Sequence, residues 1–227
     1  GLALGTLEIK KATATLAVAS AENATYTGVK YAGNVTLQSN VDTSACTLKY
    51  YSDSACATEV TPINAGDYWV KAFLAETTNY SAAASEAVKF TINPAPLTIT
   101  ASDKAITYGT APGDVMQGVT CGYTGLVDPD DENGFQLLWT TNYPEYGNVG
   151  IYTITATVVP SSANLPNYDI QYVSGKLTVN PKSIVLVPEN DNFYYDGTEH
   201  AVTATLRESD IVHNDDVRLS LAGAKQT

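Results

Sequence analysis

The densest group of side chains that could do chemistry is an acidic run beyond the middle of the chain. It contains Asp128, Asp130, Asp131 and Glu132, and a glycine follows two residues later. Closely spaced carboxylates can bind Ca²⁺ through their oxygen atoms. The run does not fit an EF-hand loop, because its glycine comes one position late and no glutamate stands at the twelfth position. We therefore consider it a weak calcium candidate, with a solvated acidic turn as the competing interpretation.

A second group consists of aromatic residues in a predicted loop. Tyr143 and Tyr146 follow Trp139 in the segment LWTTNYPEYGN. Aromatic rings can stack on a sugar or anchor a protein ligand. Trp139 is expected in the core, whereas Tyr143 and Tyr146 are weak candidates for ligand binding.

Catalytic patterns are otherwise missing from the sequence. His200 and His213 are its only histidines, and neither has a cysteine or histidine at the spacing of a zinc site. Because no histidine occurs before residue 200, a Ser-His-Asp arrangement is not expected there. No glycine-rich phosphate loop is present. We predict no catalytic residue, no cofactor and no enzymatic activity.

Composition narrows the range of partners. The formal net charge is −12, and Lys and Arg total 12 without a basic run. Proteins that bind nucleic acids through phosphates need clustered positive charge, as do those that bind anionic membranes. The longest apolar stretches are as short as strands, so we expect no membrane insertion. Neither nucleic acid nor a membrane is an expected partner.

Three cysteines are too few for a disulfide framework. Cys46 and Cys56 lie close enough in sequence for a bridge to be considered, and Cys121 stands apart. The alternative is that each thiol is buried as a small apolar side chain. The sequence leaves both interpretations open.

A longer pattern must position all of these residues, because the chain repeats itself. Residues 64–94 and 148–181 both read Asn-x-Gly-x-Tyr, an alternating run, a loop ending in Asn-Tyr, a second alternating run and Asn-Pro. Self-similarity at a long period indicates a tandem array. The distance from Pro94 to Pro181 is roughly 87 residues, close to the length of one immunoglobulin-type sandwich.

The alternation has the period of β-strands, and helical periodicity is essentially missing. We predict an all-β fold of tandem immunoglobulin-like β-sandwiches, two complete and one partial. Residues 1–9 are predicted as the terminal strand of a preceding repeat, 10–93 as repeat 1, 94–180 as repeat 2 and 181–227 as the first half of repeat 3. The expected strands cover residues 13–19, 34–37, 47–51, 67–74, 87–92, 97–101, 105–108, 119–123, 135–140, 150–159, 171–179, 183–187, 201–206 and 216–221.

The early end of repeat 3 has three explanations. A half sandwich exposes an apolar sheet face and unpaired strand edges to water. In the first explanation the sequence is cut from a longer array, and in the second the half repeat is a small sheet that packs against repeat 2. In the third explanation the first strand of a second molecule completes repeat 3, which gives a strand-exchange oligomer.

Two tyrosines are predicted to have structural roles. Tyr68 and Tyr152 each begin a long alternating strand, two residues after Gly66 and Gly150. A sandwich places a tyrosine corner at this point, with the ring packed inward and the hydroxyl bonded to upstream backbone. The glycine gives the preceding turn its conformational freedom. We interpret these four residues as scaffold rather than as a ligand platform.

Several short motifs carry a family resemblance. Repeat 2 contains the motifs Leu97-Thr98-Ile99-Thr100-Ala101, Ile106-Thr107-Tyr108-Gly109, Tyr123-Thr124-Gly125-Leu126-Val127, Asn148-Val149-Gly150-x-Tyr152, Asn167-Tyr168 and Leu177-Thr178-Val179-Asn180-Pro181. Through these motifs it resembles the MBG-type bacterial Ig-like repeats. Through Tyr195-Asp196-Gly197 and Asn214-Asp215-Asp216-Val217, repeat 3 is similar to the related YDG repeats. Through Tyr26-Thr27-Gly28 and Asn64-Ala65-Gly66-Asp67-Tyr68-Trp69-Val70, repeat 1 is similar to other bacterial Ig-like repeats.

The resemblance implies a non-enzymatic stalk or spacer of a bacterial cell-surface or adhesin-type protein. Such a segment would lie outside the cell, be attached through regions outside this sequence, and contribute to adhesion. Its expected partners are neighbouring Ig-like repeats and a host or cell-surface glycan or protein. The alternative is a carbohydrate- or protein-binding module that uses the loop aromatics Tyr143 and Tyr146.

Overall fold

The computed structural model describes residues 5–189, 192–201, 203–212, 215–220 and 225–226. His213 and Asn214, which the sequence singled out, lie outside this part of the chain. The described residues form β-strands and short 3-10 segments, with no α-helix among them. None of the helical segments found there has the length and hydropathy of a membrane span. The prediction of an all-β chain is confirmed.

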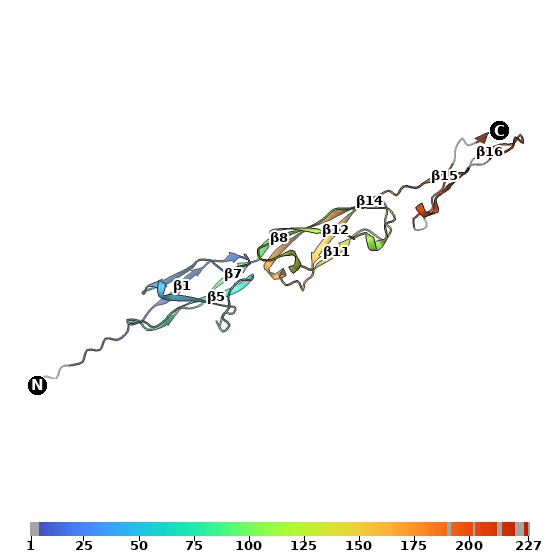
Figure 1. Ribbon diagram of the computed structural model, residues 1–227. Helices are drawn as coiled ribbons and strands as arrows, with labels where there is room; N and C mark the ends of the chain where they lie inside the picture. The colour runs from blue at the N-terminus through green and yellow to red at the C-terminus, as the bar shows by residue number, and fades with distance from the viewer. Residues whose placement is uncertain (1–4, 190–191, 202, 213–214, 221–224, 227) are drawn as a thin grey trace. The chain divides into compact units, whose positions relative to one another are not determined.

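Repeat 1 contains two sheets (Figure 1). β1 pairs with β3 in one of them, and the order in the other is β2-β7-β5-β4, with β6 added to β5. Its strands are β1 (Leu16–Ala21), β2 (Ala24–Thr25), β3 (Val35–Ser39), β4 (Cys46–Tyr51), β5 (Gly66–Leu74), β6 (Ala83–Ala84) and β7 (Val88–Asn93). The alternation of β5 buries Val70, Ala72 and Leu74, as a half-buried strand requires.

Repeat 2 has the same plan. One sheet has the order β10-β8-β13 and the other β11-β12-β14-β9. The strands are β8 (Ala95–Ala101), β9 (Lys104–Thr107), β10 (Cys121–Thr124), β11 (Leu137–Thr141), β12 (Gly150–Val158), β13 (Tyr168–Val173) and β14 (Gly175–Asn180). Its core contains Ala101, Ile106, Val115, Tyr143, Ile154, Ala156, Leu177 and Val179.

The two repeats share an unusual pairing. β2 is parallel to β7, with Ala24 opposite Ile92, and β9 is parallel to β14, with Lys104 opposite Leu177. In both repeats the long strand β5 or β12 runs antiparallel to the last strand. Two facing sheets with this repeated pattern form an immunoglobulin-like β-sandwich.

Repeat 2 departs from the predicted strands at one point. Residues 171–179 were predicted as a single strand, but Ser174 separates β13 from β14, and these strands belong to different sheets. A Cβ at Gly175 would lie 2.8 Å from the carbonyl carbon of Ser102. The glycine therefore allows the close backbone approach at which the chain passes from one sheet to the other.

Repeat 3 is more sparsely paired. β15 (Leu186–Pro188) pairs with β17 (Ala204–Leu206), and β16 (His200–Ala201) with β18 (Lys225–Gln226). Residues 216–220 have no strand, so the strand predicted at 216–221 is wrong for the described positions. Val185, Leu186 and Val187 are exposed by 41–50%. Because successive strand residues point to opposite faces, apolar side chains are exposed on both faces of this ribbon.

Residues 5–9 also differ from their prediction. They have no regular structure, and Leu7 and Ile9 are 89% and 88% exposed. A strand needs a neighbour to accept its ladder hydrogen bonds, and the structure gives this segment none. The three cysteines are free, half-buried thiols, so Cys46 and Cys56 are not bridged.

Contacts divide the chain into two compact units. The first comprises Gly1–Thr98, Tyr123–Leu137 and Val158–Gln171, and the second Ile99–Gly122, Leu138–Thr157 and Tyr172–Thr227. The residues that link repeat 1 to repeat 2 therefore belong to the first unit, and those that link repeat 2 to repeat 3 belong to the second. The repeat boundaries themselves remain a prediction.

Candidate functional site

The two scaffold tyrosines have the geometry of a tyrosine corner. The Tyr68 hydroxyl donates to the carbonyl of Asn64 at 3.0 Å, and the Tyr152 hydroxyl to that of Asn148 at 2.9 Å. Both rings are half-buried. Tyr152 packs against the core of repeat 2, and burial raises the pKa of Tyr68. Each hydroxyl bond therefore fixes its ring to the turn that leads into the long strand.

The glycines before these strands lie close to the tyrosine rings. Gly66 has a φ of +151°, a conformation that glycine adopts far more readily than other residues. A Cβ at Gly150 would lie 3.6 Å from a ring carbon of Tyr152. Each glycine therefore serves the corner locally.

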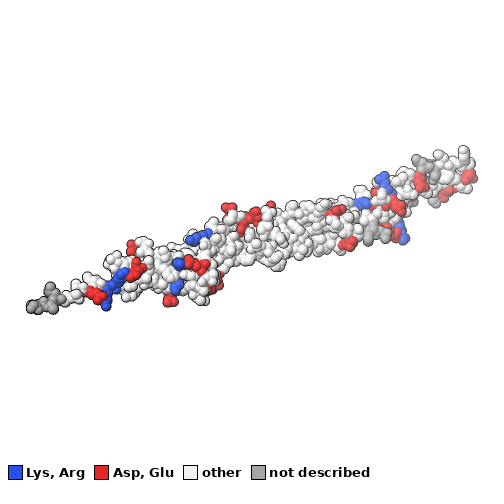
Figure 2. Space-filling model, turned by 60° about the horizontal axis from the view of Figure 1, so that its bottom comes forward, with Lys and Arg blue, Asp and Glu red and all other residues white. Residues whose placement is uncertain are grey.

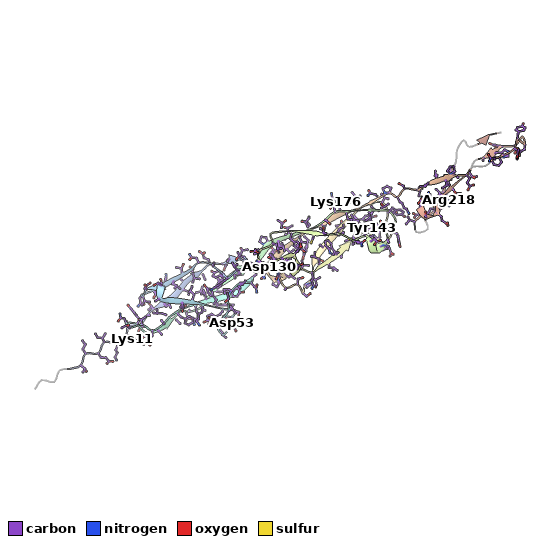
Figure 3. All side chains as sticks on the ribbon, viewed as in Figure 1. Lys11, Asp53, Asp130, Tyr143, Lys176 and Arg218 are labelled. Carbon is purple, nitrogen blue, oxygen red and sulfur yellow. The ribbon has the colours of Figure 1, made fainter. Side chains whose placement is uncertain are left out.

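The acidic run does not form a metal site in the described part of the chain, where no group of three or more His, Cys, Asp or Glu side chains could hold an ion. Asp131 precedes the 3-10 segment η3 (Glu132–Gly134), and its carboxylate accepts from the backbone N–H of Asn133 at 3.0 Å. Asp128 precedes a cis proline. Asp130 has a different set of partners (Figure 3).

One carboxylate oxygen of Asp130 accepts hydrogen bonds from two tyrosines. The hydroxyl of Tyr26 donates to Oδ2 at 2.9 Å and that of Tyr168 to the same atom at 2.8 Å. The two rings meet edge to face, with centroids 5.6 Å apart. Tyr26 comes from repeat 1, whereas Asp130 and Tyr168 come from repeat 2. We call this contact the first junction.

Burial and the charge of Asp130 both keep the hydroxyls of Tyr26 and Tyr168 protonated. Tyr26 and Tyr168 are each 5% exposed. Burial and the hydrogen bond to Asp130 raise the pKa of Tyr26 to about 12. The pKa of Tyr168 is raised too, chiefly by burial. Both hydroxyls are therefore protonated donors at neutral pH, as a negatively charged acceptor requires.

The backbone of repeat 1 aims Tyr26 at its partner. Tyr26 follows the short strand β2, and its backbone N–H donates to the carbonyl of Asn93 at 2.8 Å. Gly28, two residues later, has a φ of +72°. A Cβ there would lie 2.7 Å from Cδ of Pro129, so only glycine lets this turn approach the acidic loop so closely.

A buried amide completes the first junction. Asn167 is 6% exposed and ends the 3-10 segment η4 (Leu165–Asn167). Its Oδ1 accepts from the backbone N–H of Ala65 at 2.9 Å, and its Nδ2 donates to Oδ1 of Asn64 at 3.2 Å. Asn64 also supplies the carbonyl of the first tyrosine corner. The amide therefore connects repeat 2 to the scaffold of repeat 1.

A similar contact links repeat 2 to repeat 3, and we call it the second junction. The hydroxyl of Tyr108 donates to Oδ1 of Asp215 at 3.0 Å, and this hydrogen bond raises the pKa of Tyr108. The backbone N–H of Tyr108 donates to the carbonyl of Asn180 at 2.8 Å. Gly109 has a φ of +86°, and a Cβ there would lie 2.6 Å from a methyl group of Val212.

The two aspartates lie in matching turns. The backbone N–H of Asp130 donates to the carbonyl of Val127 at 2.8 Å, and that of Asp215 to Val212 at 2.9 Å. Both turns read Val-x-x-Asp-Asp, 85 positions apart. A turn from one repeat and a tyrosine from the repeat before it therefore form each junction.

The aromatic ligand candidates lie differently. Tyr143 is 8% exposed, donates its hydroxyl to the carbonyl of Gly147 at 3.2 Å, and packs edge to face with Tyr152. Tyr143 is therefore a core residue of repeat 2, and its buried ring offers no face to a sugar. Tyr146 is half-buried with a φ of 54°. Its role in ligand binding stays a prediction.

The sequence named most of the junction residues without finding the junctions. Tyr26, Tyr108 and Asn167 appeared as family motifs, and Asp130 appeared as a calcium candidate. The partners are about a hundred positions apart, 104 for Tyr26 and Asp130 and 107 for Tyr108 and Asp215. The recurrence of Val-x-x-Asp-Asp at a spacing of 85 was the signal that could have found them.

These features define a class of protein: tandem immunoglobulin-like β-sandwiches whose joints are held by specific contacts. Residues 97–178 match the family model described as MBG domain (YGX type). This match confirms the resemblance of repeat 2 to MBG-type repeats that its motifs indicated. A comparison with curated protein sequences found no match.

Two solved structures of Ig domains show similarity to the chain. The chain is 12% identical to the N-terminal four Ig domains of Dscam1 isoform 9.44, with a TM-score of 0.35, covering 78% of this chain and 47% of that structure. It is 11% identical to Sidekick-1 immunoglobulin domains 1–4, with a TM-score of 0.23, covering 87% of this chain and 56% of that structure. The chain spans about half the length of these structures.

Proposed function

We propose that this chain is a non-catalytic spacer from the extracellular part of a bacterial cell-surface protein. Its repeats would hold a more distant, adhesive region in a defined direction. The observation that carries this proposal is the recurrence of the tyrosine–aspartate contact at both joints. A ligand-binding module needs one site, whereas a spacer needs the same joint each time a repeat is added.

The first joint leaves little freedom for bending. β7 ends at Asn93 and β8 begins at Ala95, so Pro94 alone connects the strands. Because proline fixes its own φ angle, this one-residue connection is stiff and is not a flexible tether. Without specific contacts, neighbouring domains are expected to move relative to each other. The first junction supplies such contacts through Asp130 and Asn167.

The surface supports a spacer that does not associate with its own copies. The face in Figure 2 has scattered acidic side chains and fewer basic ones, in line with the net charge of −12. Like charges oppose nonspecific association. Ion pairs such as Lys11–Glu76 and Lys89–Asp67 are exposed, and pairs of this kind stabilise a fold by about 0–1 kcal/mol.

Distance measurements between two spin labels test the proposal. Labels at Ser54 in repeat 1 and Ser161 in repeat 2, both exposed, would be placed in a chain whose three cysteines are replaced by alanine. We expect one narrow distance distribution, which broadens when Asp130→Ala removes the shared acceptor. A distribution that is already broad with Asp130 present would refute a joint that holds direction.

The assignment to the cell surface has its own test. An antibody raised against the chain should label intact cells of the source organism, and labelling that needs permeabilised cells would contradict the assignment. A glycan array run with the chain and with Tyr146→Ala separates the ligand-binding alternative. Binding that Tyr146→Ala abolishes would favour that alternative over a spacer.

A further inference from the structure

The segment that carries the junction tyrosine and its glycine, at Tyr26–Gly28 in repeat 1 and Tyr108–Gly109 in repeat 2, has a third counterpart in repeat 3. We call these segments the tyrosine turns. Tyr195 stands 14 residues after Pro181, as Tyr108 stands 14 residues after Pro94. Gly197 follows it with a φ of +73°, close to the +72° of Gly28 and the +86° of Gly109. Gly197 lies two residues after its tyrosine, as Gly28 does, whereas Gly109 directly follows Tyr108. The third turn therefore combines a tyrosine and a left-handed glycine at the spacing of the first turn.

The first two turns are covered by a partner. Their glycines leave no room for a Cβ, because the acidic loop lies against Gly28 and Val212 lies against Gly109. Their tyrosine hydroxyls donate to Asp130 and Asp215. In both cases the partner is a Val-x-x-Asp turn of the following repeat.

The third turn is exposed but already formed. Nothing lies within 4 Å of a Cβ at Gly197, and Tyr194 and Tyr195 are 96% and 90% exposed. Asp196 stabilises the turn from within, since its carboxylate accepts from the N–H of Thr198 at 2.9 Å and from its hydroxyl at 2.7 Å. A preformed turn loses little conformational freedom on binding.

We propose that residues 194–197 form a docking surface for a further Ig-like repeat. The partner would place the carboxylate of a Val-x-x-Asp turn on the Tyr195 hydroxyl and its backbone against Gly197. This inference rests on the proposed function, because it assumes that the joints follow one rule. It names the partner by chemistry: a β-sandwich with an acidic turn at its leading end.

The chain itself argues for this occupant. Both occupied turns bind a carboxylate, which accepts a stronger hydrogen bond from a phenol than a neutral acceptor does. Both also bind it within one polypeptide, where a short connection raises the effective concentration of the partner. A separate glycan or protein would need neither the close approach at glycine nor the acidic turn.

Two extended chains test the inference. Thr227 of repeat 3 corresponds to Asn142 of repeat 2, since the matching Val-x-x-Asp turns lie 85 positions apart. The control extension adds a second copy of residues 143–180 after Thr227, which supplies the missing strands of repeat 3. The test extension adds residues 143–227, which supplies the same strands and a following repeat with its own Asp215. Tyr194→Phe and Tyr195→Phe in the added copy leave the original Tyr195 as the only one that peptide mass spectrometry reads.

Nitration of tyrosine by tetranitromethane, read by peptide mass spectrometry, reports on access to the Tyr195 ring. We expect Tyr195 to react at least about tenfold more slowly in the test extension than in the control extension. Asp215→Ala in the added copy should restore most of the rate. Equal rates in the two extensions would overturn the proposal, as would slowing in the unextended chain that grows with its concentration, because a second copy would then be the occupant.

Rapid amide exchange would reveal added strands that do not fold. In that case, a single substitution in the unextended chain tests the inference. Thr27→Asp converts the first turn from Tyr-Thr-Gly to the Tyr-Asp-Gly of the third, at an exposed position. We expect Tyr26 to remain as slow to react as in the parent. A reaction about tenfold faster would show that a Tyr-Asp-Gly turn cannot dock on an acidic turn. The spin-label test uses the unaltered first junction, so the two proposals can fail separately.

Discussion

Removing one hydroxyl group should weaken the joint between repeats 1 and 2 without disturbing either sandwich. Tyr26→Phe keeps the ring, and so keeps the edge-to-face contact with Tyr168. It deletes the 2.9 Å hydrogen bond to Asp130. Hydrogen bonds to charged groups contribute about 1.5–3 kcal/mol to stability. Because the 2.8 Å bond from Tyr168 keeps Asp130 satisfied, we expect a loss of about 1.5 kcal/mol, at the low end of that range.

The chain carries its own probes for this measurement. Of its two tryptophans, Trp69 lies in β5 of repeat 1 and Trp139 in β11 of repeat 2. Variants that keep one tryptophan each report thermal unfolding of one repeat by fluorescence. A loss of about 1.5 kcal/mol should lower the midpoint seen by the repeat 1 probe by roughly 6–12 °C, the shift for a domain of 60–100 residues.

A double-mutant cycle isolates the pair. Tyr26→Phe, Asp130→Ala and the double variant should give a coupling energy of about 1 kcal/mol. The matched control is Tyr195→Phe, which removes a hydroxyl from a 90% exposed ring and should change stability by less than about 0.5 kcal/mol. If Tyr26→Phe behaves like Tyr195→Phe, or the coupling is zero, the junction does not hold the repeats together.

Three further predictions follow from the same geometry. Since the pKa of Tyr26 is raised to about 12 from 10, the unfolded state loses this proton first as pH rises. The contribution of Tyr26 to the free energy of unfolding should be fully present below pH 10 and should be lost between about pH 10 and 12. In denaturant titrations, Tyr26→Phe should not show this part of the pH-dependent decrease in stability. Gly28→Ala should destabilise the chain by more than Gly118→Ala, because both positions have positive φ but only Gly28 has atoms in the place of a Cβ; equal losses in calorimetry would contradict the close approach. Tyr152→Phe should cost about 1 kcal/mol in chemical denaturation through loss of the bond to Asn148, and a variant of unchanged stability would remove the case for a tyrosine corner.

Local patterning was enough to predict the sandwiches. The alternation of β5 and β12 fixes which side chains are buried, and both copies bury their last three inward-facing residues. The strand break at Ser174 cannot be read from the sequence, because the alternation from Val173 to Val179 continues across it. Period-two patterning identifies a strand but does not show that its halves belong to different sheets. That information is in Gly175, whose role depends on the backbone at Ser102.

The candidate site could not be predicted in the same way, because its chemistry depends on contacts distant in sequence. A carboxylate in an acidic run has two common uses: it binds a cation or accepts hydrogen bonds. Composition around Asp130 favours the first, since several carboxylates are adjacent. The structure assigns the second, because Tyr26 and Tyr168 reach the same oxygen from two repeats. The neighbouring Asp131 turns to its own backbone instead.

In each joint, one tyrosine is bonded both to the Asn-Pro connection and to the Val-x-x-Asp turn, the two motifs that recur along the chain. The backbone N–H of Tyr26 is bonded to Asn93, the residue before the connecting proline, and its hydroxyl is bonded to the next repeat. Tyr108 is bonded in the same two ways, to Asn180 and to Asp215. Tilting one repeat against the next would therefore strain the hydroxyl bond while the backbone bond holds the tyrosine to its own last strand. This is a physical reason for the tyrosine turn and the Asn-Pro connection to recur together, since each is effective only when the other is in place.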